Sequence, residues 1–179
     1  MTVEELWHLE LIRQLKYRYV GAMDTHDWAL MASCFTENAT FLPHGGKYNK
    51  RGRAEIVAFF EEVVNPTMVS SHSVTHPEIV LTGAATAYGR WRLDDTIYFT
   101  EANPGVTGME VTGGQRLRGA AYYYDEYELC PAGWQISYLS SVRIFTHLEP
   151  IPTGSQLTIE PSLGALRPWP RGPSSTSTE

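Results

Sequence analysis

Four polar residues have the types and the spacing that proton-transfer chemistry needs. Tyr19 and Asp24 lie at the end of the first predicted helix. His72 opens a predicted strand, and Asp95 lies on the next strand, with mostly apolar residues around all four. A histidine that meets an aspartate in an apolar pocket can act as a general base, and a tyrosine or a second carboxyl group beside it can hold or protonate an oxygen. The sequence therefore favours proton-transfer chemistry over simple binding.

The composition indicates one globular domain. The chain has 179 residues, of which 42% are hydrophobic and 19% are charged, and a chain of this length can bury a sizeable core. Aromatic residues make up 12% of the chain, which favours β structure and apolar cavities. The net charge of −6, without a run of Lys or Arg, argues against nucleic acid or an anionic membrane as a partner.

The N-terminus and the cysteines indicate where the protein works. The first ten residues, MTVEELWHLE, are acidic and lack the apolar core of a signal peptide. No apolar run approaches the roughly 18 residues that a membrane-spanning helix needs, so we expect a cytoplasmic protein. Cys34 and Cys130 are far apart in apolar contexts, which favours two small buried side chains over a disulfide.

Helical periodicity accounts for the first part of the chain. Thr2 and Glu5 have the spacing of a capping box, so we expect a helix to begin there. Its apolar stripe repeats every three or four residues and contains Leu11, Ile12, Leu15, Tyr19, Ala22 and Met23. Tyr19 therefore points inward, and Asp24 lies where this helix ends. Further helices are expected over about residues 28–35 and 53–64.

The rest of the chain is typical of strands joined by turns. Strands are expected over about residues 37–43, 71–82, 85–100, 116–130 and 133–146. Segment 101–115 is Gly-rich and long for a hairpin connection, so we expect a lid or a binding loop there. Helices followed by antiparallel strands predict an α+β domain over residues 1–150, a cone of curved antiparallel or mixed sheet with three N-terminal helices. Residues 151–179 are expected to form an extended or disordered tail.

Alternation along the strands selects two charged residues that face inward. In segment 85–100, Asp95 is the only charge on the face that carries Trp91. A buried carboxylate must be paired or protonated; alternatively, a bulge turns Asp95 outward or it bonds a nearby backbone N–H. On the last strand Arg143 shares a face with Phe145. Arg143 therefore either pairs with a pocket acid at the mouth of the cone or pairs on the surface.

The histidines do not have the pattern of a metal site. His72 and His76 are four residues apart, which on a strand is about 13 Å and too far for joint chelation. No His or Cys cluster has zinc spacing, and the sequence has no phosphate loop, dinucleotide fingerprint or nucleophile elbow. We expect neither a metal nor another cofactor. The remaining histidines lie in helical, turn or terminal contexts and are expected to be solvated: His8, His26, His44 and His147.

Taken together, these segments resemble a known family. The resemblance rests on YVGAMDTHDWALMASCFTENATF, SSHSVTHPEI, ATAYGRWRLDDTIYF, and GAAYYYDEYEL with GWQISYLSSVRIF. Over about residues 8–148 the chain resembles the SnoaL-like branch of the nuclear-transport-factor-two-like superfamily, whose members are cones of curved antiparallel sheet with three helices. It is most similar to the bile acid 7α-dehydratases. Scytalone dehydratases, hexachlorocyclohexane dehydrochlorinases and polyketide cyclases are more distant relatives.

The resemblance implies a catalytic set and a reaction. The residues that match in order and spacing are Tyr19, Asp24, His72, Asp95 and Arg143. The implied reaction eliminates water from a hydroxyl group β to a carbon that a ketone makes acidic, without a cofactor. His72 would take the proton, Asp24 would hold its imidazole, and Tyr19 would donate to a substrate oxygen. A protonated Asp95 would donate to the leaving hydroxyl, while Arg143 would orient Asp95, favouring its ionised form, or bind an acidic end of the substrate.

Other functions stay open at the level of sequence. The same residues would serve the isomerisation or ring closure of a polyketide or terpenoid, and the superfamily also contains pockets that only bind an apolar ligand. Segment 100–117 looks longer than in the bile acid enzymes, and the chain after Glu149 differs from theirs, so both bear on the substrate. We expect an apolar polycyclic hydroxy-ketone, such as a steroid. We also expect a homo-oligomer, either a dimer or a trimer, because such cones commonly associate through the exposed sheet face.

Overall fold

A computed structural model describes residues 1–103 and 111–158. Its helices are α1 (Val3–Thr25), α2 (Trp28–Ser33), the short turn α3 (Pro43–Gly46) and α4 (Arg53–Val63). Its strands are β1 (Phe35–Leu42), β2 (Lys50–Arg51), β3 (Met68–Leu81), β4 (Thr86–Phe99), β5 (Gln115–Cys130) and β6 (Gly133–Pro150). The middle of the predicted loop at 101–115, and most of the predicted tail, lie outside the described residues.

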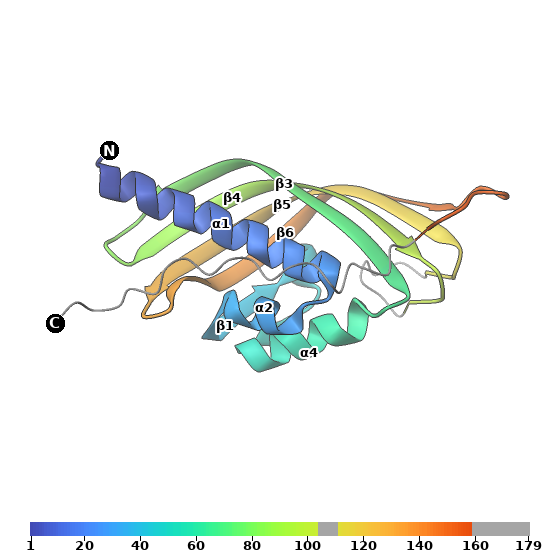
Figure 1. Ribbon diagram of the computed structural model, residues 1–179, viewed down its shortest axis with the longest axis horizontal. Coiled ribbons are helices and arrows are strands. Elements are labelled where there is room, and N and C mark those ends of the chain that lie inside the picture. Colours follow the sequence, from blue (N-terminus) through green and yellow to red (C-terminus); the bar gives the residue numbers. More distant parts are fainter. Residues whose placement is uncertain (104–110, 159–179) are drawn as a thin grey trace.

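The strands form one curved mixed sheet in the order β2-β1-β6-β5-β4-β3. The pair of β1 and β6 is parallel, and the other neighbouring pairs are antiparallel. Figure 1 shows α1 lying across one face of the sheet, with α2 and α4 beside its C-terminal half. This α+β arrangement confirms the predicted fold class.

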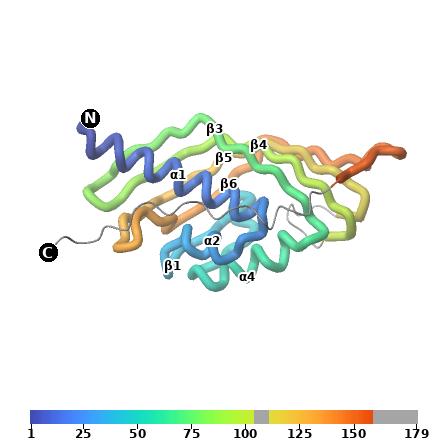
Figure 2. Tube along the Cα trace, in the orientation of Figure 1, coloured from blue at the N-terminus to red at the C-terminus, as the bar shows by residue number. Residues whose placement is uncertain are grey.

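Helix α1 is fixed at both ends by local contacts. The Thr2 side chain accepts from the backbone N–H of Glu5, and the Glu5 carboxylate accepts from the backbone N–H of Thr2 at 2.6 Å. At the other end His26 adopts the left-handed conformation of a C-cap, with φ of 55°. The buried face of α1 packs against β3 (Figure 2). This packing places Tyr19 inside the molecule and Asp24 beside the start of β3.

An irregularity in β6 changes which side chains face the inside of the sheet, compared with the simple alternation that the sequence predicts. The pairing with β5 shifts register between Ala120 and Ala121, where Phe145 and Arg143 are the successive partners. A bulge of this kind moves the following side chains to the other face. Phe145, which we expected on the same face as Arg143, is therefore 52% exposed.

None of the helices in the described part of the chain is long and apolar enough to cross a membrane.

Candidate active site

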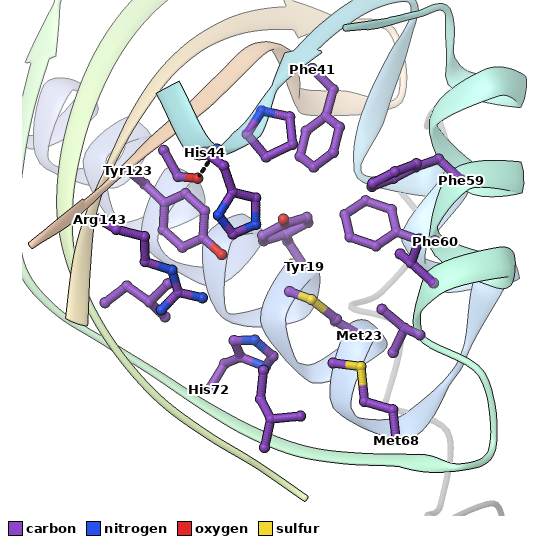
Figure 3. Close-up of a pocket in the computed structure, with 16 residues that line it drawn as sticks. Tyr19, Met23, Phe41, His44, Phe59, Phe60, Met68, His72, Tyr123 and Arg143 are labelled. Atoms are coloured by element: carbon purple, nitrogen blue, oxygen red, sulfur yellow. Dashed lines mark hydrogen bonds between the residues drawn. The ribbon is translucent and has the colours of Figure 1, made fainter. Parts of the chain in front are cut away.

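A small cavity lies between α1, α4 and the inner face of the sheet, with a volume of about 50 Å³. Most of its wall is apolar and aromatic: Met23, Phe41, Pro43, Phe59, Phe60, Val63, Val64, Met68, Leu93 and Ile97. The polar part of the wall consists of Tyr19, His44, His72, Tyr123, Ser141 and Arg143. Figure 3 shows the labelled polar side chains entering the cavity from different elements of the fold: Tyr19, His44, His72, Tyr123 and Arg143. The site is therefore a largely apolar pocket with a few polar groups in its wall.

Asp24 and His72 form a hydrogen-bonded dyad at one side of the pocket. The His72 Nδ1 atom lies 2.6 Å from Asp24 Oδ1, and the His72 backbone N–H donates to Asp24 Oδ2 at 2.8 Å. The Ser70 hydroxyl donates to Asp24 Oδ1, also at 2.8 Å. These contacts fix the carboxylate and the ring, because Asp24 receives hydrogen bonds on both oxygens. With Nδ1 engaged, Nε2 is the ring nitrogen left to serve the pocket.

Asp95 and Arg143 form a second pair on the neighbouring wall. The two terminal guanidinium nitrogens of Arg143, Nη1 and Nη2, donate to the two oxygens of Asp95 at 2.7 and 2.6 Å, which is the strong bidentate arrangement. The Asp95 side chain is fully buried, whereas that of Arg143 is 17% exposed and lines the cavity. Strand β5 runs between their strands, and Gly119 provides the space: a Cβ atom there would lie 2.5 Å from Arg143 Nη1.

This geometry bears on the expected acid role of Asp95. Asp95 does not line the cavity, and both of its oxygens accept from Arg143. A carboxyl group in that position holds the arginine and has no oxygen directed at a substrate. This arrangement favours Asp95 as the group that positions Arg143. The sequence suggested the pairing of these two residues, but with Arg143 orienting Asp95.

Two buried tyrosines meet at the floor of the pocket. The rings of Tyr19 and Tyr123 pack edge to face with centroids 6.1 Å apart. Burial is the main cause that raises the pKa of Tyr19 well above its usual value, and the nearby Tyr123 is the second cause. Burial also raises the pKa of Tyr123. Both hydroxyl groups therefore keep their protons at physiological pH and can act as hydrogen-bond donors.

The structure overturns the prediction that His44 is solvated. The neighbouring glycines suggest an exposed turn, yet His44 lines the pocket together with His72. Its backbone N–H donates to the hydroxyl of Ser141, 97 residues away in the chain, at 3.1 Å. Burial, and then the charge of Arg143, lower the pKa of His44 to about 4, so the ring is neutral near pH 7. The sequence holds no local signal for this placement, because β6 supplies the anchor.

A buried ion pair that we did not predict lies behind the tyrosines. The Lys16 ammonium is 2.7 Å from Asp125 Oδ2, and both side chains are fully buried. The same ammonium lies 3.6 Å from the centre of the Tyr123 ring. The Tyr127 hydroxyl donates to Asp125 at 2.6 Å and accepts from the indole N–H of Trp91 at 2.9 Å. Alternation along β5 did contain a signal, because Asp125 shares the inward face with Tyr123 and Tyr127.

The structure places four of the five predicted residues at the pocket, and the fifth, Asp95, contacts Arg143 from outside it; their catalytic roles stay predictions. The predicted residues that line the cavity are Tyr19, His72 and Arg143. Asp24 reaches it through His72. In residues 1–103 and 111–158, no cluster of three or more His, Cys, Asp or Glu side chains could hold a metal ion.

Comparison with known proteins identifies the family. A family model for the SnoaL-like domain matches residues 4–140. The chain belongs to this family. The predicted membership is thereby confirmed, while the finer resemblance to bile acid 7α-dehydratases stays a prediction.

Several solved structures share the fold of this SnoaL-like chain. A candidate scytalone dehydratase from Novosphingobium aromaticivorans matches with a TM-score of 0.70 and 16% identity, over 88% of this chain and 100% of that chain. The hexachlorocyclohexane dehydrochlorinase LinA-type3 from Novosphingobium barchaimii matches with a TM-score of 0.67 and 19% identity, over 88% and 99% of the two chains. A protein from Novosphingobium aromaticivorans described as having a cystatin-like fold matches with a TM-score of 0.59 and 18% identity, over 79% and 85%. At these identities the likeness establishes the fold.

Proposed function

We propose that this SnoaL-like protein is a cofactor-independent lyase that eliminates water from an apolar hydroxy-ketone, with the Asp24–His72 dyad as its base. The observation that carries the proposal is the 2.6 Å contact between His72 Nδ1 and Asp24 Oδ1 at the wall of an apolar cavity. A histidine held in this way has a fixed tautomer, and the carboxylate stabilises the imidazolium formed when Nε2 takes a proton. Family membership, and a fold shared with a dehydrochlorinase and a candidate dehydratase, support an elimination.

The proposed reaction balances without a further reactant. His72 Nε2 removes a proton from the carbon next to the ketone, and the C–H electron pair forms an enolate. The enolate then forms the C=C bond as the C–O bond to the β-hydroxyl breaks. The leaving hydroxide takes the proton back from the His72 imidazolium, which restores the neutral base and releases water. Protonated Tyr19 and Tyr123 supply hydrogen-bond donors at the floor of the pocket.

The pocket wall guides the choice of substrate. Its aromatic and methionine side chains suit an apolar ring system. The cavity of about 50 Å³ is well below the roughly 300 Å³ at which small-molecule pockets begin. A steroid, our first proposal from the sequence, therefore requires flexible side chains such as Met23 and Met68 to move. A bicyclic aromatic hydroxy-ketone requires less movement, so both size classes belong in the test.

The test compares two histidines of the same strand. Wild type, His72→Asn and His76→Asn are incubated with bicyclic β-hydroxy ketones and with hydroxylated 3-oxo steroids, and mass spectrometry follows the loss of water. His76 is exposed and outside the pocket, and its φ of 50° is one that asparagine tolerates. We expect His72→Asn, and likewise Asp24→Asn, to lower turnover by at least about 10²-fold while His76→Asn stays near wild type.

Other results would point to the two alternative functions. A new product of unchanged mass that depends on His72 would identify an isomerase or cyclase. Tight binding of the ketones without any conversion would identify a binding protein. Water loss that persists at wild-type rates in folded His72→Asn would refute the dyad as the base.

A further inference from the structure

His44 is held inside the pocket in a conformation that histidine rarely adopts. It has φ of 56° and ψ of 47°, and the left-handed turn continues through Gly45. A non-glycine residue at positive φ is uncommon, and such strain persists only where the surroundings enforce it. The hydrogen bond from its backbone N–H to Ser141 Oγ, at 3.1 Å, is the long-range contact that fixes this turn to β6. The fold therefore directs an imidazole into the cavity at a conformational cost.

The ring of His44 has the properties of a neutral donor. The charged groups that face it are Arg143 on β6, Asp95 on β4 and Lys47 beyond the same turn. Together with burial, the two cations outweigh the carboxylate and keep the ring uncharged. Within residues 1–103 and 111–158 the ring nitrogens make no hydrogen bond; the ring itself packs edge-on against Tyr48. One nitrogen of a neutral imidazole always carries a proton, so the His44 ring has one N–H that it can offer to a ligand in the cavity.

The proposed reaction can use such a donor in addition to the hydroxyl groups of Tyr19 and Tyr123. When His72 removes a proton next to a ketone, negative charge develops on the ketone oxygen, and catalysis depends on a preorganised donor there. A neutral imidazole can fill this role, because it polarises a carbonyl group without competing for the proton. Asp95 is engaged by Arg143 and does not line the cavity. Figure 3 shows the imidazoles of His44 and His72 entering the cavity from different parts of its wall.

We propose that His44 is a second catalytic histidine, whose neutral imidazole N–H holds the ketone oxygen of the substrate while negative charge builds on it. The proposal rests on the proposed function, since it names the group that stabilises the enolate in that reaction. The proton from carbon goes to His72, the C–H electron pair moves into the enolate, and His44 keeps its own proton throughout. The site thus divides the work between a histidine that takes a proton and a histidine that donates a hydrogen bond.

Binding of phenols tests the donor without any turnover. An ionised phenol resembles an enolate oxygen on an aromatic ring, so a series of substituted phenols of graded acidity and the matching cyclohexanols are titrated by calorimetry into wild type, His44→Asn and His44→Gly. Asparagine and glycine both tolerate the positive φ, but only asparagine keeps a donor. Wild type is expected to bind the more acidic phenols more tightly. The affinity of His44→Gly for these phenols is expected to be lower than that of wild type by roughly 10-fold or more, with little change in its affinity for the cyclohexanols.

The outcomes separate this proposal from the proposed function. Retained phenol affinity in His44→Asn, together with loss in His44→Gly, supports His44 as the oxygen donor even when no ketone is converted, a result that would sink only the lyase. Equal phenol affinity in wild type and His44→Gly overturns the proposal, and so does a wild type that binds none of the phenols. Equal loss for phenols and cyclohexanols also overturns it, because it would mean that His44 merely shapes the cavity. Where an active ketone is found, His44→Gly is expected to lower kcat by about 10²-fold.

Discussion

The Asp95–Arg143 pair and the Lys16–Asp125 pair both bury charge at the inner face of the sheet, but only the first reaches the pocket. Arg143 makes two aligned hydrogen bonds to Asp95 and also lines the cavity. The second pair has a single close contact of 2.7 Å and no exposure at either side chain. Among the described residues, Lys16 Nζ and Asp125 Oδ1 lack an aligned hydrogen-bond partner.

The two pairs therefore serve different purposes. An incompletely bonded, fully buried pair is weak evidence for stabilisation, because desolvation offsets the attraction. Burial raises the pKa of Asp125 and lowers the pKa of Lys16, while the charge of each partner opposes that effect. The pair is therefore costly to break and contributes little as an intact unit. The pair instead holds part of the pocket wall in place, since the Lys16 ammonium lies against the ring of Tyr123, which lines the pocket.

Breaking the buried pair by one substitution is expected to give the largest effect on folding. Lys16→Met fills a similar volume but leaves the carboxyl group of Asp125 uncompensated. We expect the free energy of unfolding to fall by about 3–5 kcal/mol, measured by urea denaturation at pH 7. The double variant Lys16→Met with Asp125→Asn removes both charges and keeps an acceptor for Tyr127. It should therefore regain most of the free energy of unfolding that the single variant loses. A single variant that loses less than about 1 kcal/mol would show that the pair is not held as two charges.

A smaller but more selective effect is expected from two strand glycines. A Cβ atom at Gly119 would lie 2.5 Å from Arg143 Nη1 and 2.8 Å from Asp95 Oδ1, whereas one at Gly89 would lie 2.9 Å from a ring carbon of Tyr127. Each alanine variant should cost about 2 kcal/mol through overpacking. Only Gly119→Ala displaces a group that lines the pocket. Turnover per folded molecule, or phenol affinity, should therefore fall in Gly119→Ala and not in Gly89→Ala, and equal losses in both would contradict the division of roles.

The sequence predicted the parts of the site that follow from local periodicity. Helical spacing placed Tyr19 inward and Asp24 at a helix end, and strand alternation placed Asp95 on the buried face. The fold class and the family are confirmed. The homo-oligomer, the cytoplasmic location and the boundary at residue 150 stay predictions.

The features that the sequence missed depend on contacts between distant segments. Lys16 lies on the same helical face as Ile12 and Tyr19, yet a lysine normally indicates a solvated position, and its partner became evident only once α1 was packed against the sheet. His44 follows a proline and precedes two glycines, which is typical of an exposed turn. The bulge in β6 that turns Phe145 outward has no marker in the sequence. Local pattern thus predicted the elements, and tertiary packing decided which polar groups face one another.

The smallest expected effect is on the free energy of unfolding at acid pH. It concerns His44, which belongs to the pocket wall and not to the buried pair. The pKa of His44 in the folded protein is about 4, whereas its ordinary value is 6.5. Between pH 6.5 and pH 4, His44 therefore binds a proton in the unfolded chain but stays neutral in the native protein. Stability from this group is therefore present above about pH 6.5 and is lost as the pH falls towards 4. Partial exposure of the ring reduces the effect to about 1 kcal/mol. Urea denaturation from pH 7 to 4.5 should show a shallower loss of stability in His44→Asn than in wild type or in His76→Asn. An equally steep loss in His44→Asn would mean that other groups set the acid sensitivity. Asp125 would not be among them, because its raised pKa lets the native protein take up that proton before the unfolded chain does.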